Sequence, residues 1–288
     1  MQNVLITGAN SGIGRAAAVR FAQAGHHVFA AMRDLAKSRK LLALASAAGV
    51  QDNIEPVKLD VTDEESVKNC FLRIAPIDVL VNNAGIAWNA AVEDVEIDSA
   101  KQVFETNYWG VLRCIQAVLP RMRERRAGTI VNVSSVMGRV AGIGQPIYAS
   151  SKWALECLSE NLAQEMAPHN VRVIVIEPGV TRTAILAKNA DYPSPTHYES
   201  AYRRMMQFHE KGALANATSE SVADTIVFSL EDPKRLLRYP CAWAGTEMTE
   251  GRAQISDEDW VQLGAETDDN AYYDAFEKLF GLDLRTDG

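Results

Sequence analysis

The chain has 288 residues, of which 47% are hydrophobic and 23% charged, and a formal net charge of −8, a balance typical of soluble globular proteins. No run approaches the ~20 apolar residues of a membrane-spanning helix, and the first residues, MQNVLITGAN, have neither the basic start nor the long apolar core of a signal peptide. The acidic balance argues against nucleic acid as a partner.

Apolar runs rich in β-branched residues alternate with amphipathic runs through the first part of the chain. They predict strands at residues 3–7, 27–32, 54–59, 78–82, 129–133 and 171–176, with helices between them such as those at residues 14–25, 35–48 and 63–74. Strands that alternate with helices of this length form βαβ units with right-handed crossovers. The sequence therefore predicts an α/β fold with a doubly wound parallel sheet and helices on both faces.

The pattern changes after Thr183. Residues 219–230 have helical spacing, with Thr218 or Ser219 as the cap. The segment at residues 236–240 predicts a last strand.

The acidic charge is concentrated at the end of the sequence. Residues 250–288 contain eleven acidic and three basic side chains, so the rest of the chain is formally neutral. In this stretch Tyr272, Phe276 and Phe280 are spaced by four residues, which predicts a short amphipathic helix docked on the body of the protein.

Cysteine and histidine spacing gives no sign of a metal site. Cys70, Cys114, Cys157 and Cys241 stand far apart without a CxxC pair, and the five histidines show no ligand spacing. We expect no metal, free thiols and a reducing, cytoplasmic location.

A glycine-rich turn, TGANSGIG at residues 7–14, joins the first predicted strand to the first helix. Glycines at 8, 12 and 14 would let the backbone approach a pyrophosphate at the helix N-terminus. The spacing is GxxxGxG without GK[ST], which excludes a nucleoside-triphosphate P-loop. A tight turn without a ligand is the alternative.

The stretch SSVMGRVAGIGQPIYASSKWALE at residues 134–156 places Tyr148 and Lys152 four positions apart. On a helix these side chains share one face. A phenol beside a fixed cation is a candidate acid–base group, although an ordinary surface pair has the same spacing.

Together these motifs resemble the short-chain dehydrogenase/reductase family. NNAG at residues 82–85 follows the fourth strand, Asn107 lies in ETNYWG, PGVTRT at residues 178–183 follows the sixth strand, and Ser135, Tyr148 and Lys152 fit the pattern S-x12-Y-x3-K. With the glycine-rich turn, five motifs stand in the family's order over residues 3–183.

The resemblance implies a Rossmann-type sheet of about seven strands with a C-terminal lid and tail region. It implies one domain over residues 1–288. Within it, residues 1–183 would bind the cofactor and carry catalysis, and residues 184–288 would supply the substrate lid, the last strand and the acidic extension.

The activity that the resemblance implies is hydride transfer between a nicotinamide and a carbonyl or carbinol carbon. Tyr148 would act as acid or base, and Lys152 would lower the pKa of the phenol from its usual ~10 and bind the nicotinamide ribose. Ser135 would hydrogen-bond the substrate oxygen, and its spacing to Tyr148 selects it over Ser134. Asn107 would hold a proton-relaying water or, alternatively, serve as a structural amide that bridges strands.

The same resemblance assigns the cofactor contacts to residues of these motifs and of the strand ends. They are Gly8, Asn10, Ser11, Gly12, Ile13, Gly14, Arg33, Asp60, Val61, Asn83, Ala84, Gly85, Tyr148, Lys152, Pro178, Gly179, Val180 and Thr183.

The end of the second strand indicates which nicotinamide is bound. Met32 stands where NAD-preferring folds place an acidic residue, and Arg33 follows it. Arg33 and Ser11 suit a 2′-phosphate, so we expect NADP(H), with NAD(H) possible because Arg33 can instead stack on adenine. Asp34 is expected to start the next helix, and Asp60 to meet the adenine edge.

The substrate follows from the branch that the chain resembles, which holds 17β-hydroxysteroid and retinol dehydrogenases. A bulky apolar alcohol or ketone, steroid- or retinoid-like, is expected. Side chains that either line its pocket or only pack the lid are Met137, Tyr192, Tyr198, Met205, Met206 and Phe208. Gly142 and Gly144 either leave room for the ligand or only shape a loop.

Two other functions compete with this one. A sugar epimerase or dehydratase is disfavoured, because the chain lacks TGxxGxxG and a longer sugar domain. A catalytically silent, NADP-sensing protein that binds partners remains open, although all four catalytic positions are present.

The oligomeric state is expected by analogy with the family. Helices at residues 97–124 and 147–167 would pair in a homodimer, with a tetramer possible, and the apolar faces of LRCIQAVLP and WALECLSENLA fit such an interface.

Overall fold

The computed structural model describes residues 1–183 and 196–285. Within these residues the chain forms a parallel sheet in the order β3-β2-β1-β4-β5-β6-β7. Its strands are β1 (Asn3–Thr7), β2 (His27–Met32), β3 (Ile54–Lys58), β4 (Val79–Asn82), β5 (Gly128–Val133), β6 (Val171–Pro178) and β7 (Arg238–Cys241). The order reverses between β1 and β4, where ligands of such sheets bind beyond the carboxyl ends of the strands. The predicted doubly wound fold is confirmed.

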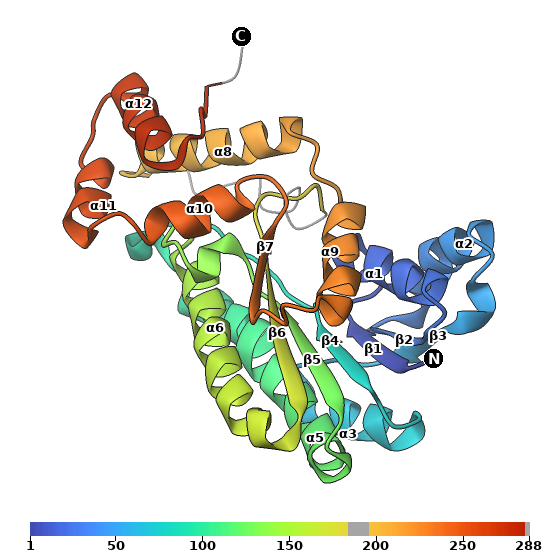
Figure 1. Ribbon diagram of the computed structural model, residues 1–288. Coiled ribbons are helices and arrows are strands. Elements are labelled where there is room, and N and C mark those ends of the chain that lie inside the picture. The colour runs from blue at the N-terminus through green and yellow to red at the C-terminus, as the bar shows by residue number, and fades with distance from the viewer. Residues whose placement is uncertain (184–195, 286–288) are drawn as a thin grey trace.

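Helices cover both faces of the sheet (Figure 1). Those of the described residues are α1 (Gly12–Gln23), α2 (Arg39–Ala47), α3 (Glu64–Arg73), α4 (Ile97–Phe104), α5 (Gly110–Arg125), α6 (Pro146–Met166), α8 (Glu199–Leu214), α9 (Ser219–Glu231), α10 (Gly245–Arg252), α11 (Asp257–Gly264) and α12 (Asp269–Phe280). Helices α1, α2 and α9 pack on one face of the sheet, and α3, α5 and α6 on the other.

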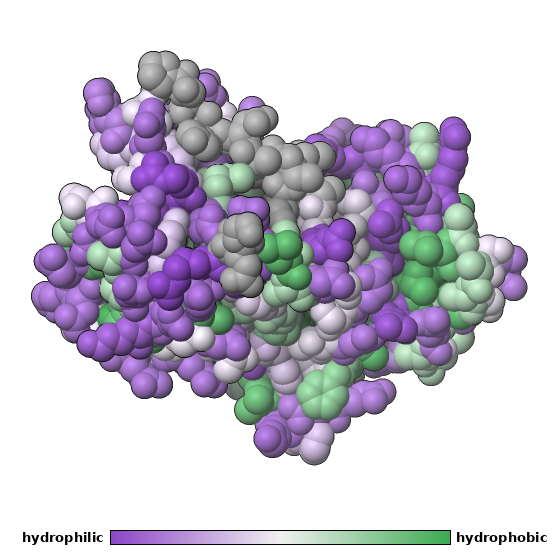
Figure 2. Space-filling view, turned by 90° about the horizontal axis from the view of Figure 1, so that it is seen from above, coloured by the Kyte–Doolittle hydropathy of each residue, from purple (hydrophilic) through white to green (hydrophobic). Residues whose placement is uncertain are grey.

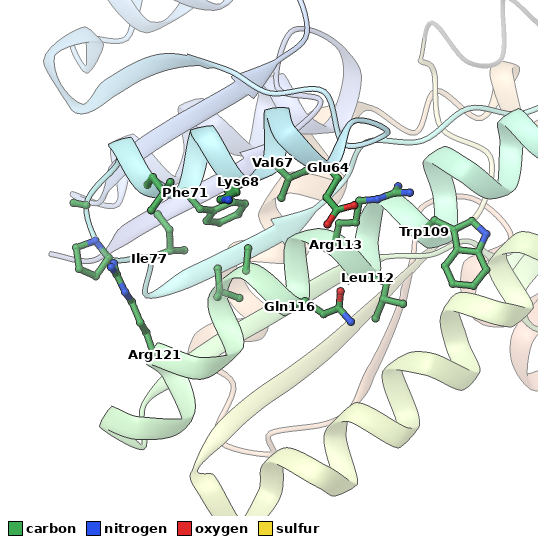
Figure 3. Close-up of a pocket in the computed structure, with 15 residues that line it drawn as sticks. Glu64, Val67, Lys68, Phe71, Ile77, Trp109, Leu112, Arg113, Gln116 and Arg121 are labelled. Carbon is green, nitrogen blue, oxygen red and sulfur yellow. The ribbon is translucent and has the colours of Figure 1, made fainter.

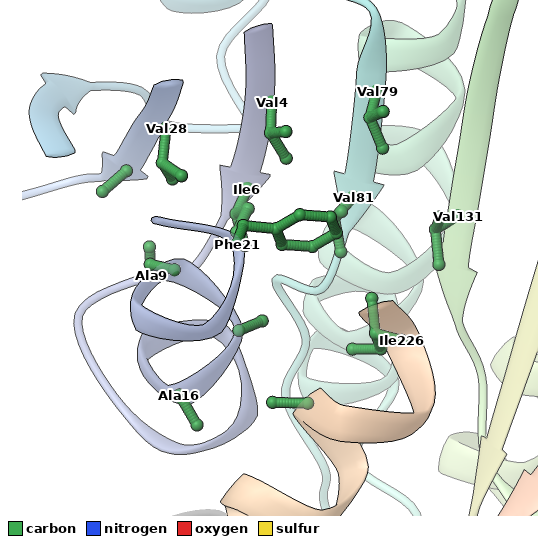
Figure 4. Close-up of a cluster of buried hydrophobic side chains, with 14 of the residues drawn as sticks. Val4, Ile6, Ala9, Ala16, Phe21, Val28, Val79, Val81, Val131 and Ile226 are labelled. Carbon is green, nitrogen blue, oxygen red and sulfur yellow. The ribbon is translucent and has the colours of Figure 1, made fainter. Parts of the chain in front are cut away.

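The first of these cores is built around Phe21, which is fully buried on α1. Its ring lies against Val4 and Ile6 of β1 and Val81 of β4, with Ile226 of α9 nearby (Figure 4). Small residues along α1, such as Ala17, let the helix lie close to the sheet. This close packing fixes the start of α1, and with it the glycine-rich turn.

The predicted boundaries hold with small differences. Thr218 caps α9. The helix expected at residues 35–48 begins as a 3₁₀ turn, Leu35–Ser38, because Asp34 accepts a hydrogen bond from Ala36 N and caps that turn first. The last strand extends through Pro240, which is tolerated because β7 is an edge strand.

The C-terminal elements α8, α10, α11 and α12 lie together at the end of the sheet where the strands finish (Figure 1). The predicted docked helix is confirmed as α12, whose Tyr272, Phe276 and Phe280 are buried. They pack in a cluster with Met137 and Phe208, so the acidic extension is attached to the main body by apolar contacts.

Several apolar residues that the sequence analysis assigned to a dimer interface are buried within the subunit. Cys114, Ile115 and Val118 of α5 and Leu155 and Leu162 of α6 are buried against the sheet. These five residues therefore cannot contact a second subunit, because amphipathic helices of a doubly wound fold first cover the sheet, while the pairing of the two helices in a dimer stays a prediction.

The outward faces of α5 and α6 are more polar than their inner faces. Two tryptophans are exposed here: Trp109, which directly precedes α5, is 47% exposed, and Trp153, within α6, is 50% exposed. Seen from above, the surface is mainly hydrophilic and the hydrophobic residues form only small groups (Figure 2). None of the helices in the described ranges is both long and apolar enough to cross a membrane.

Candidate active site

The glycine-rich turn is held against the loop after β4. Gly8 and Gly12 have positive φ angles of 68° and 52°, which glycine adopts without strain. A Cβ on Gly14 would lie 2.3 Å from Nδ2 of Asn83. That amide donates to Thr7 O at 2.9 Å and Gly8 O at 3.4 Å. Gly14 therefore serves close packing behind the turn.

The N-terminus of α1 suits an anion. Its first turn contains no acidic residue, and Ser11 forms no side-chain cap hydrogen bond there. Free backbone N–H groups and the helix dipole together favour a phosphate at such a position. The turn therefore fits the pyrophosphate of a dinucleotide.

At the end of β2, the side chains divide as the sequence suggested. Met32 is buried and Arg33 is exposed at the edge of the cavity described below. Asp34 is occupied as the cap of the following turn. At the end of β3, Oδ1 of Asp60 accepts hydrogen bonds from N and Oγ1 of Thr62.

Ser135, Tyr148 and Lys152 meet where β5 ends and α6 begins. Ser135 Oγ donates to Pro178 O at 3.4 Å and accepts from Met137 N at 3.2 Å. Lys152 is 5% exposed, its Nζ donates to Val133 O at 2.9 Å, and it lies 5.7 Å from the centre of the Tyr148 ring. The predicted spacing therefore brings the three side chains together.

Burial dominates the proton chemistry of this group. It raises the pKa of Tyr148, and a hydrogen bond with the Ser135 side chain opposes that rise. It also lowers the pKa of Lys152 to about 8, against the influence of Glu156. The sequence analysis expected Lys152 to lower the pKa of Tyr148. The net shift is upward because removal from water disfavours the charged form of both groups.

Asn107 lies in a turn of π-helix, Glu105–Trp109, between α4 and α5. Its Oδ1 accepts from Ile86 N at 2.9 Å, and its Nδ2 donates to Ile86 O at 2.9 Å and Ser151 Oγ at 3.0 Å. The amide therefore ties the loop after β4 to α6, a structural role, although it does not bridge strands as the structural alternative supposed. A Cβ on Gly85 would lie 3.3 Å from Asn107 Oδ1 and 3.8 Å from Lys152 Nζ, so the three motifs converge here.

A cavity of about 730 Å³ joins these elements at the carboxyl ends of the strands. Of the residues predicted for the site, only Gly14 and Asn107 do not line it. Those that do are Gly8, Asn10, Ser11, Gly12, Ile13, Arg33, Asp60, Val61, Asn83, Ala84, Gly85, Ser135, Tyr148, Lys152, Pro178, Gly179, Val180 and Thr183.

The predicted lid residues divide between two surroundings. Met137 and Phe208 line the cavity. Tyr198, Met205 and Met206 pack instead in a separate small cluster with Ala91 and Tyr202. Tyr192 lies outside the described residues.

The space beside Gly142 and Gly144 is occupied by methionine side chains and is not open. A Cβ on Gly142 would lie 2.6 Å from the sulfur of Met137, and one on Gly144 2.9 Å from the sulfur of Met205. Gly144 also has a positive φ of 76°. The loop-shaping alternative is therefore the one seen.

Sequence reasoning missed several residues of the site. Thr7 Oγ1 accepts from the backbone N of Asn83 and Ala84, at 3.0 and 2.9 Å, and so fixes the end of β4. Gln145 and His209 also line the cavity. Gln145 stands three positions before Tyr148, a spacing that could have identified it. His209 carries no such signal.

A second cavity, of about 620 Å³, lies between α3 and α5. Phe71 and Ile77 line one part of it, and Trp109, Arg113 and Gln116 another (Figure 3). It contains none of the predicted site residues, so the candidate site is the cavity at the strand ends.

Comparison with known proteins identifies the family. A sequence model described as short chain dehydrogenase matches residues 2–193. The chain belongs to the short-chain dehydrogenase family.

Three curated relatives show the range of the family. Over 246 residues, covering 82% of this chain and 87% of the relative, it is 37% identical to the uncharacterized oxidoreductase YusZ of Bacillus subtilis. It is 40% identical to human retinol dehydrogenase 8, over 65% of this chain and 61% of that protein. It is 34% identical to human 17-beta-hydroxysteroid dehydrogenase type 1, over 82% of this chain and 76% of that protein.

Solved structures of this family share the fold. A short-chain dehydrogenase from Streptomyces avermitilis superposes with a TM-score of 0.77 at 32% identity, covering 93% of this chain and 98% of that one. A short-chain dehydrogenase from Sphingobium yanoikuyae in complex with NADPH superposes with a TM-score of 0.68 at 27% identity, covering 83% of this chain and 86% of that one. The family and its oxidoreductase relatives support an enzyme.

Proposed function

We propose that this dehydrogenase is an NADP(H)-dependent oxidoreductase that interconverts a bulky apolar ketone and its alcohol, with Tyr148 as the acid and base. The observation that carries the proposal is the convergence of Ser135, Tyr148 and Lys152 on the cavity that also contains the glycine-rich turn. A nicotinamide bound there would supply or accept the hydride.

The proton chemistry follows from the burial of the two ionisable groups. With its pKa raised by burial, the phenol is protonated near neutral pH, so it holds the proton that the oxygen of a carbonyl would receive on reduction. The hydroxyl of Ser135 would hydrogen-bond the same oxygen and stabilise its developing charge. Lys152, held by Val133 O, would orient the ribose and the phenol.

Preference for the 2′-phosphate rests on Arg33. Within the described residues it forms no ion pair, and the nearest acidic residue in sequence, Asp34, is used as a cap. A phosphate is a strong partner for an unpaired guanidinium. The related Sphingobium structure, which contains NADPH, agrees with this preference.

An apolar substrate is supported by Met137 and Phe208, which line the cavity beside Tyr148. The names of two relatives, a retinol dehydrogenase and a 17-beta-hydroxysteroid dehydrogenase, are consistent with a retinoid- or steroid-like molecule. Helices α8 and α12 would form its lid within the single domain that we propose for the chain.

We further propose a cytoplasmic homodimer. Free cysteines at all four positions suit a reducing compartment. The exposed Trp109 and Trp153 lie where α5 and α6 of two subunits would meet.

The experiment is a panel assay of NADPH and NADH oxidation with steroid ketones, retinal, medium-chain ketones and small polar ketones. Turnover of the apolar compounds, faster with NADPH, is expected. Turnover of small polar ketones alone would overturn the substrate class. NADPH binding without turnover of any carbonyl would favour the catalytically silent alternative.

A further inference from the structure

Next to the Tyr148–Lys152 pair lies a buried charged group that the proposed reaction does not use. It consists of Glu156 on α6, Glu177 near the end of β6 and Arg238 on β7. The two carboxylates are only 4% and 2% exposed. Arg238 Nε lies 3.0 Å from Oε2 of Glu156 and 3.5 Å from Oε1 of Glu177.

Buried oxygen atoms in and beside this group lack hydrogen-bond partners. Oε1 of Glu156, Oε1 of Glu177 and Oγ of Ser134 are buried without a hydrogen-bond partner. Arg238 also pairs with the exposed Glu160 at 2.8 Å. Within the described residues, Arg238 is the cation that forms ion pairs with the two buried carboxylates, and it is already engaged with Glu160, which is an unfavourable arrangement.

A proton on one carboxylate would resolve the imbalance. Arg238 is nearer to Glu156, so Glu156 retains the charge. Burial, followed by repulsion from Glu156, raises the pKa of Glu177 to about 7, while Arg139 and Arg238 act in the opposite direction. A protonated Glu177 would supply the donor that the unpartnered oxygens lack.

We propose that Glu177 carries a proton in the active protein and donates a hydrogen bond to Glu156, and that this pair is a positioning unit for the catalytic group. Glu156 stands one helical turn after Lys152 and is its acidic neighbour. Glu177 precedes Pro178, whose carbonyl accepts the hydrogen bond from Ser135. The pair thus connects α6, which carries Lys152, to β6, whose Pro178 carbonyl accepts the hydrogen bond from Ser135.

Loss of this proton would change the charge around Lys152. A second negative charge would stabilise the ammonium and oppose ionisation of Tyr148. The other titratable groups around the pair, within the described ranges, are Lys152 and Glu160 from α6, Arg139 from the turn after β5, and Arg238 and Cys241 from β7.

The first test needs no enzymatic activity. The folded pKa of Glu177 is about 7, above the ordinary 4.5. Its stabilising contribution is therefore complete below pH 4.5 and is lost as pH rises through 7. Relative to Glu177→Gln, the unfolding constant of the wild type should rise on the order of 100-fold across this window. If the unfolding constants of the two proteins change in parallel with pH, the proposal is overturned.

Glu165→Gln is the matched control, because Glu165 is an exposed acid of the same helix that takes no part in this group. Its curve should follow the wild type. Infrared spectra of the wild type provide a second measurement that does not depend on the variant folding. A protonated-carboxyl band that titrates near pH 7 is expected, and its absence at pH 6 would contradict a protonated Glu177.

The positioning role rests on the proposed function and is tested by the pH profile of kcat/KM. In Glu177→Gln, the ionisation assigned to the Tyr148–Lys152 pair should move to lower pH by about half a unit, whereas Glu165→Gln should leave it in place. An unmoved profile would overturn the positioning role. If no substrate is turned over, the stability and infrared results still decide whether Glu177 is protonated.

Discussion

The phenol of Tyr148 and the ammonium of Lys152 are both held away from water, and burial moves their pKa values in opposite directions. Each shift favours the neutral side chain. The protonated phenol holds the proton that the proposed carbonyl reduction requires, while its raised pKa by itself makes it a weaker acid than an exposed tyrosine. Arg33, by contrast, is exposed where it lines the same cavity.

Removal of the Arg33 charge should weaken NADPH binding selectively. Arg33→Ala is expected to raise the Kd of NADPH about tenfold, because a charge-assisted contact to the 2′-phosphate is lost, with little change for NADH. Calorimetric titration of both cofactors measures this. Lys40→Ala, at an exposed residue of α2 outside the cavity, is the control, and equal losses for NADPH and NADH would refute the role of Arg33.

Much of the site could be predicted at this scale, because the residues of each motif are local in sequence. The glycine-rich turn and the Tyr148–Lys152 spacing are examples. Thr7 and Glu177 could not be found in this way. The hydroxyl of Thr7 binds backbone 76 and 77 residues away, and the surroundings of Glu177 come from three separate elements.

Two elements position the site: the turn between β1 and α1, and the C-terminal helix α12. The turn depends on the absence of a side chain at Gly14, where a Cβ would meet Asn83 Nδ2. Helix α12 reaches the cavity indirectly, since Phe276 lies 6.2 Å from Phe208, ring centre to ring centre. The sequence predicted both elements, because their patterns lie within single segments.

Gly14→Ala should disturb both stability and cofactor binding. Overpacking against Asn83 is expected to cost about 1–3 kcal/mol and to weaken NADPH binding, because Asn83 holds Thr7 O and Gly8 O. Denaturant unfolding and NADPH titration measure the two effects. Gly264→Ala, where an added Cβ meets nothing within 4 Å, should change neither. Normal NADPH binding by Gly14→Ala would count against the turn as the cofactor site.

Phe276→Ala tests the attachment of the acidic extension. Phe276 is 3% exposed, and loss of such a ring is expected to cost about 3–5 kcal/mol on denaturant unfolding. The KM for an apolar ketone should also rise, because Phe208 loses its support. Leu214→Ala, at a residue that is 66% exposed, should stay within about 0.5 kcal/mol. A stable Phe276→Ala protein with unchanged KM would show that the extension has no part in the lid.

Across the whole molecule, the sequence predicted the sheet and its layers but not the surface that subunits would share. The alternation of strands and helices determines the layers. The apolar faces of α5 and α6 were assigned to an interface and instead cover the sheet, since periodicity shows only that a face is buried and not what buries it. The exposed Trp109 and Trp153 indicate the interface that we now propose.

Trp153→Glu should separate the proposed dimer. Sedimentation of the wild type is expected to give twice the chain mass of 31.6 kDa, and the variant should sediment as a monomer because a charge replaces the apolar contact. Val261→Glu, at a residue 73% exposed on α11, should remain dimeric. A dimeric Trp153→Glu protein would place the interface elsewhere.

The central claim is that Tyr148 transfers the proton at a bound carbonyl, and single-turnover oxidation of bound NADPH by the best ketone of the panel tests it most directly. Tyr148→Phe should slow this step about 10²–10⁴-fold with the Kd of NADPH nearly unchanged. Tyr198→Phe, which removes the hydroxyl that donates to Glu93 outside the cavity, should react like the wild type. A Tyr148→Phe protein that reacts within tenfold of the wild type would contradict the proposed mechanism.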